Sequence, residues 1–134
     1  MIAIVGYVAA LVAFVGADMV WLSIMVPRLY KPTIANLMAE TVNLPAGIAF
    51  YLIAPAGVAY FAIWPALKAQ SLSVALVNGA LFGFFTYATY DLTNQATLKD
   101  WTTQLTLVDM AWGCALGAFA AGVGYLAASR LAGA

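Results

Sequence analysis

The sequence predicts an all-α membrane protein in which four transmembrane helices form an antiparallel bundle. The chain has 134 residues, of which 66% are hydrophobic and only 7% are charged, whereas a soluble domain carries about 25% charged residues. Lipid cannot satisfy free backbone groups, so membrane spans are helices or closed barrels. The apolar runs are continuous and rich in Ala, Leu and Gly, without the alternation that barrel strands show. The spans are therefore expected to be helices.

Four apolar runs are long enough to span a bilayer, which takes about 20 residues at about 1.5 Å each. We place them at about residues 2–26, 44–67, 71–90 and 105–128 of a single integral membrane domain, residues 1–134. No basic residue precedes the first run, which favours a span over a cleaved signal peptide.

The first connection is the longest, and its pattern predicts a short amphipathic helix at the membrane surface over about residues 32–43. Pro32 suits a first helical turn, and Ile34, Leu37 and Met38 follow at three- and four-residue spacing. The second connection, around Lys68, is very short. The second and third spans should therefore be antiparallel neighbours.

Small residues recur where helices could approach closely. Gly79 and Gly83 are four residues apart on the third span, and Gly113 and Gly117 repeat this spacing on the fourth. Such small-xxx-small patterns allow close backbone packing in lipid. We interpret them as packing seams with no chemical role. In the second span Pro55 lies mid-helix, where it removes a hydrogen bond and favours a kink.

Three aspartates lie within the predicted spans, and an antiparallel topology brings them to one membrane face. Asp18 is near the end of the first span, Asp91 is at the end of the third, and Asp109 is near the start of the fourth. A carboxylate inside a membrane is costly and is commonly functional. The cluster is tolerable if protons are shared, if neighbouring side chains donate hydrogen bonds, or if a cation binds. Arg28, Lys31 and Lys99 are candidate counter-charges.

The surrounding residues are aromatic or polar and share helical faces with the aspartates. Positions 87, 90, 91 and 94 fall on one face of the third span, and each of Asp18 and Asp109 is followed three residues later by a tryptophan. The predicted ligand-binding pocket consists of Asp18, Trp21, Tyr87, Tyr90, Asp91, Asn94, Asp109 and Trp112. The alternative is that these polar residues only hold helices together and that the aromatic residues anchor the interface.

The segment GALFGFFTYATYDLTNQATLKDW at 79–101, followed by VDMAWG at 108–113, closely resembles a family of small four-span bacterial inner-membrane proteins classed as a domain of unknown function. The resemblance extends over the whole chain, including DMVW at 18–21. It implies a multi-pass protein of the bacterial inner (cytoplasmic) membrane and brings no established activity. An association of such proteins with lipid-modifying enzymes directs the ligand hypothesis toward lipids.

Three functions remain open from the sequence. The pocket could bind the polar group of an amphipathic or lipid-like molecule, the aspartates could serve proton- or cation-coupled transport, or the chain could be an accessory subunit or form a homo-oligomer. The chain has no histidine, which excludes Ser–His and Cys–His catalysis. Acid–base chemistry by a carboxylate stays open, without an assigned catalytic residue. We expect no cofactor, no bound metal and no nucleic acid partner.

Overall fold

The computed structural model describes residues 1–133, and four helices within them are long and apolar enough to cross a membrane. This confirms the predicted class of four packed apolar helices. The first contains α1 (Ile2–Met25), a π-helical turn η1 (Val26–Tyr30), α2 (Lys31–Ile34) and a 3₁₀ turn η2 (Ala35–Leu37). The second contains α3 (Leu44–Val58), a π-helical turn η3 (Ala59–Ile63) and α4 (Trp64–Ala69); α5 (Leu72–Thr97) and α6 (Thr103–Ala132) are the third and fourth.

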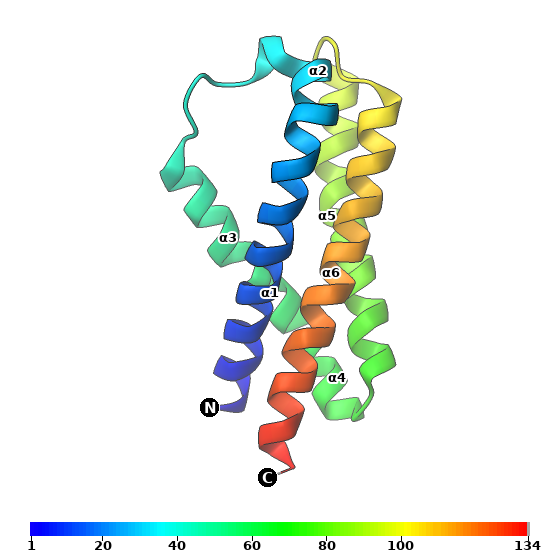
Figure 1. The fold of residues 1–134 in the computed structure, drawn as a ribbon. Helices are drawn as coiled ribbons and strands as arrows, with labels where there is room; N and C mark the ends of the chain where they lie inside the picture. The colour runs from blue at the N-terminus through cyan, green and yellow to red at the C-terminus, as the bar shows by residue number, and fades with distance from the viewer. Residues whose placement is uncertain (134) are drawn as a thin grey trace.

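The helices alternate in direction, so both chain ends lie at one end of the bundle and α2 lies at the other (Figure 1). α5 and α6 pack along their length, and α1 packs against α6. α3 crosses obliquely and diverges from the other helices toward the end that carries α2 (Figure 1). This divergence creates the space in which the candidate site lies.

A separate interfacial helix over 32–43 is not confirmed. Helical structure runs from α1 without a break as far as Leu37, and Met38 then adopts an extended backbone. The N–H of Lys31 bonds to the carbonyl of Val26, five residues back, which widens the turn just before Pro32. Pro32 therefore follows directly on the first span and does not begin a new helix.

Side-chain caps define where three later helices begin. The side chains of Asn43, Ser71 and Thr102 accept hydrogen bonds from the backbone N–H three residues on, at 3.3, 3.4 and 3.1 Å. Each satisfies a donor that the first helical turn leaves free. At the end of α4, Gln70 adopts the left-handed conformation with φ 50° and closes the tight connection to α5. These local signals fix the short connections around the bundle.

The predicted glycine seam joins α5 to α6. A Cβ added at Gly83 would lie 2.7 Å from the carbonyl carbon of Gly113, and one at Gly79 would lie 2.6 Å from the Cβ of Ala121. A Cβ at Gly124 on α6 would lie 2.7 Å from the carbonyl oxygen of Gly6 on α1. Only glycine permits such close backbone approach, which is how small residues promote helix packing in lipid.

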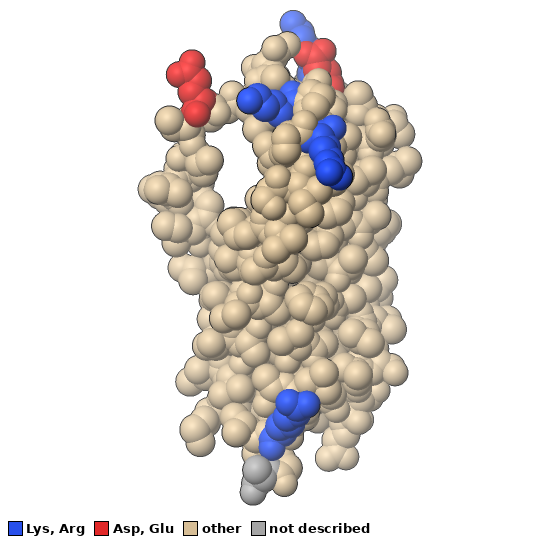
Figure 2. Space-filling view, viewed as in Figure 1, with Lys and Arg blue, Asp and Glu red and all other residues tan. Residues whose placement is uncertain are grey.

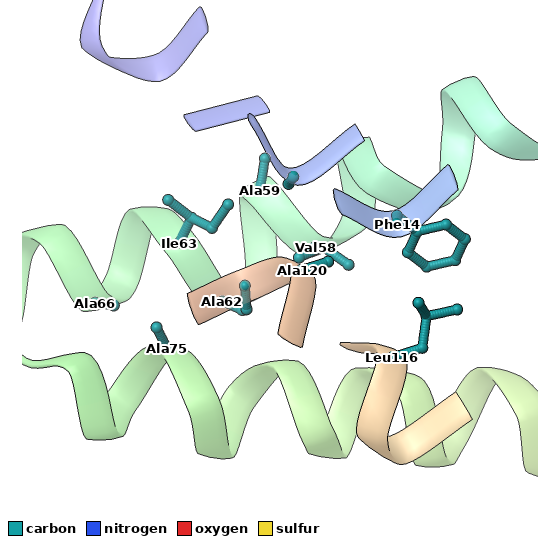
Figure 3. Packing of buried hydrophobic residues seen from close by; sticks show 11 residues of the cluster. Phe14, Val58, Ala59, Ala62, Ile63, Ala66, Ala75, Leu116 and Ala120 are labelled. Carbon is teal, nitrogen blue, oxygen red and sulfur yellow. The ribbon is translucent and has the colours of Figure 1, made fainter. Parts of the chain in front are cut away.

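The half of the bundle nearer the chain ends has an apolar core (Figure 3). Its buried members come from every span: Ala10, Phe14, Val58, Ala59, Ala62, Ile63, Ala66, Ala75, Leu116, Ala120 and Ala121. The outer surface is also apolar, and Figure 2 shows the charged side chains at the two ends of the bundle with an uncharged belt between them. This distribution suits a hydrocarbon environment around the middle of the molecule.

The second span is irregular near its centre, and neighbouring helices compensate for the irregularity. Pro55 lies inside α3, and the π-helical turn η3 begins four residues later. The hydroxyl of Tyr7 on α1 donates to the Leu52 carbonyl at 2.9 Å, and the Asn78 amide on α5 donates to the Phe61 carbonyl at 3.2 Å. Polar side chains thus supply donors to the backbone where regular α-helical geometry is lost.

Candidate functional site

A cavity of about 740 Å³ lies between α1, α3, α5 and α6, in the half of the bundle that carries α2. Figure 2 shows the surface hollowed where α3 diverges from the other helices. The wall is mainly apolar, with Phe14, Leu22, Val26, Ile34, Phe50, Ile53 and Phe82 among its members, and its polar members are Asp18, Tyr30, Thr86, Tyr87, Tyr90 and Asp109. One side of the cavity can therefore hold polar groups and the rest apolar ones.

Asp18 is a buried carboxylate with two hydrogen-bond donors from different helices. The Tyr51 hydroxyl on α3 donates to its Oδ2 at 2.6 Å, and the Trp112 indole N–H on α6 donates to its Oδ1 at 2.9 Å. Asp18 itself is 6% exposed. Because both oxygens have donors, this carboxylate is held in place and links α1, α3 and α6.

The two tryptophans form a stacked pair that connects Asp18 with Asp109. The rings of Trp21 and Trp112 are parallel within 2°, with centroids 4.5 Å apart. The Trp21 indole N–H donates to the Tyr30 hydroxyl at 3.0 Å, and that hydroxyl donates to the Oδ1 of Asp109. A continuous polar and aromatic network therefore joins the first and last spans.

Asp91 and Asp109 lie against each other between α5 and α6. Asp91 is fully buried, and among residues 1–133 the group that lies against its carboxyl oxygens is the Asp109 carboxyl. Asp109 is 6% exposed and lines the cavity. Two carboxyls can hydrogen-bond each other only when one of them holds a proton, so this pair is expected to share a proton and carry one negative charge.

Only some of the predicted site residues line the cavity. Tyr87 and Tyr90 line the cavity. The Tyr87 ring packs over Gly113. The Tyr90 ring meets the Trp101 ring edge-on, with ring centroids 5.7 Å apart. Asn94 is half-buried farther along α5 and lies outside the cavity wall. In the part of the chain that the structure describes, no group of three acidic or cysteine side chains is placed to hold a metal ion.

Two tyrosines in the network were not predicted from the sequence. Tyr51 lies on the second span, four residues before Pro55, and Tyr30 lies in η1. At about 100° per residue a regular α-helix would put Tyr30 opposite Trp21, and the π-helical turn changes that register. For Tyr51 the sequence shows only a tyrosine on the second span. Its contact with the Asp18 carboxylate depends on the path of α3, which the sequence pattern does not give.

The candidate counter-charges do not neutralise the aspartates. Arg28, Lys31 and Lys99 are exposed, whereas tyrosine and tryptophan donors contact Asp18 and Asp109. Hydrogen bonds stabilise a carboxylate but leave its charge in place. The cavity therefore has an acidic wall.

Residues 3–126 match the family described as Predicted membrane protein (DUF2177). No curated protein and no solved structure matches the chain. The match covers most of the sequence and all of the residues that surround the cavity. The chain therefore belongs to the DUF2177 family of predicted membrane proteins.

Proposed function

We propose that this multi-pass protein lies in the bacterial inner membrane and that it binds an amphipathic, lipid-like molecule in the cavity between α1, α3, α5 and α6. The observation that carries the proposal is a volume of about 740 Å³ with polar side chains on one part of the wall and apolar side chains on the rest. Cavities that bind small molecules measure about 300–1,000 Å³ and combine these two features.

The polar group of the ligand would lie beside Asp109, with Tyr87, Tyr90 and Thr86 on the α5 side of the cavity. The apolar part would contact Phe50 and other apolar wall residues toward α3. Because α3 diverges from the bundle (Figure 1), a tail could extend between spans and remain in a hydrocarbon environment. The ligand would then enter from the membrane.

The two predicted tryptophans and Asp91 would position the binding groups. Trp112 holds Asp18, and Trp21 donates to the tyrosine that contacts Asp109. Such supporting hydrogen bonds keep a binding group in one orientation. Asp91 would act through Asp109, since it lies behind the cavity wall.

Binding accounts for the geometry better than transport across the bundle. The cavity occupies one half of the molecule, and the other half contains the apolar core of Figure 3. Charged and polar groups are strongly disfavoured in such surroundings. A transport route would therefore need this core to open.

The proposal is tested by native mass spectrometry of protein purified in native nanodiscs. Ala54 lines the cavity, and Ala54→Phe adds a ring to it. Ala13 lines a separate apolar depression on the surface of α1 and α6, so Ala13→Phe is the matched control. We expect the wild type and Ala13→Phe to retain a bound amphiphile that folded Ala54→Phe has lost. An equal complement of bound molecules in all three proteins would refute cavity binding.

A further inference from the structure

We propose that the polar group bound in this cavity is an organic cation, an amine or quaternary ammonium attached to an apolar tail. This inference rests on the proposed binding function and assigns the charge of its ligand. The supporting observations are the acidic residues of the wall, the second carboxyl that lies against one of them and the tyrosine rings around it.

The wall has acidic groups and no compensating cation. Asp18 and Asp109 line the cavity, and no Lys or Arg is among the described residues that do so. A buried carboxylate is strongly disfavoured unless it is paired or well hydrogen-bonded. An anionic ligand such as a phosphate would add repulsion, whereas an ammonium group would offset the charge.

The two acidic wall residues differ in how many of their carboxyl oxygens accept a hydrogen bond from a tyrosine or tryptophan. Both oxygens of Asp18 already accept hydrogen bonds, from Tyr51 and Trp112. In residues 1–133 the Asp109 carboxyl accepts from Tyr30 at Oδ1, and its neighbour Asp91 has no tyrosine or tryptophan donor at either oxygen. A cation beside Asp109 would pair with the negative charge that these two carboxyls share. Asp109 is therefore the expected contact.

Aromatic rings complete the arrangement that an ammonium group favours. Tyr30, Tyr87 and Tyr90 line the cavity together with Asp109, and the Tyr30 hydroxyl donates to the Asp109 carboxyl. Ring faces attract cations, and the attraction is stronger where water is excluded. Quaternary ammonium ligands are commonly recognised by rings of this kind. Uncharged hydroxyl groups would gain neither this attraction nor the ion pair.

The test uses amphiphiles that share a dodecyl tail and differ in the head group. The protein is placed in micelles of an uncharged sugar detergent, because zwitterionic lipids carry an ammonium group themselves. The fluorescence of its four tryptophans follows the addition of dodecyltrimethylammonium, dodecyl phosphate or dodecanol. We expect the ammonium compound to bind at least about ten-fold more tightly than the other two, which corresponds to about 1.4 kcal/mol. Asp109→Asn should remove this preference, and Glu40→Gln, an exposed acidic residue outside the cavity, should retain it.

Each other result has a distinct meaning. Equal or tighter binding of dodecyl phosphate or dodecanol would overturn the cation inference and leave the binding function intact. Saturable binding of none of the three would contradict both. If Asp109→Asn folds poorly, Asp91→Asn replaces it, because its amide can donate to Asp109 and should also weaken ammonium binding. Unchanged preference in a folded Asp109→Asn or Asp91→Asn protein would overturn the assignment to this carboxyl pair.

Discussion

Replacing Gly113 by alanine tests whether close helix packing positions the cavity wall. A Cβ at Gly113 would lie 2.6 Å from the Cδ2 of Tyr87, and Cγ and Cδ1 of that ring would be closer still. These atoms are at the base of the ring, so rotation of its tip cannot relieve the clash. The Tyr87 side chain must move as a whole, or α5 and α6 must separate.

The expected cost follows from two opposing effects. Overpacking of a well-packed site destabilises a protein by about 1–3 kcal/mol, whereas Gly→Ala in a helix gains up to about 1 kcal/mol. Gly16 on α1 has no atom within 4 Å of an added Cβ, so Gly16→Ala gains helix propensity without a clash. We therefore expect Gly113→Ala to be less stable than Gly16→Ala by about 1–3 kcal/mol.

The assay is equilibrium unfolding in mixed micelles, followed by helical circular dichroism, with ligand binding measured on the same preparations. Gly113→Ala should unfold at lower denaturant and bind the amphiphile more weakly, because Tyr87 lines the cavity. Gly16→Ala should match or exceed wild-type stability and bind normally. Equal stability and equal binding for the two variants would refute the packing argument.

Two further substitutions test the hydrogen-bonded network. Tyr51→Phe should destabilise the fold by about 1–2 kcal/mol in the same unfolding assay, since it removes a donor from the buried Asp18. Tyr7→Phe removes an exposed bond to a neutral carbonyl and should lower the free energy of unfolding by less. The reverse order of stability would contradict the role given to Asp18. Asp91→Asn should stabilise the fold by up to about 1–3 kcal/mol, because an amide N–H can donate to Asp109 without the proton that a carboxyl needs. Its thermal unfolding midpoint checks this, and a lowered midpoint would show that the Asp91 carboxyl is itself stabilising.

Periodicity and topology were sufficient to predict the framework of this molecule. The four-residue spacing of Gly79 and Gly83 on one helix and of Gly113 and Gly117 on the other indicated the seam at which α5 and α6 meet. Antiparallel spans were also enough to predict that the three aspartates lie in the same half of the bundle. These features depend on average helix geometry, which sequence patterns report well.

The departures arise from irregular geometry that a regular helix pattern does not encode. The π-helical turn at Val26–Tyr30 extends the first span past Pro32 and places Tyr30 beside Asp109. The oblique path of α3 brings Tyr51 to Asp18 and opens the cavity (Figure 1). Asp91 was expected in the pocket, but it packs behind the wall because its helix face meets α6.

Photo-crosslinking gives the most direct test of the cavity as a binding site. A dodecylammonium carrying a diazirine in its tail is bound to the protein in nanodiscs, irradiated, and mapped by peptide mass spectrometry. We predict labels on the apolar wall toward α3 and α5, at Phe50, Ile53 and Phe82, which excess dodecyltrimethylammonium removes. Labels that resist competition and lie mainly in the depression lined by Ile4, Val8, Val12, Phe119 and Val123 would contradict the proposed site.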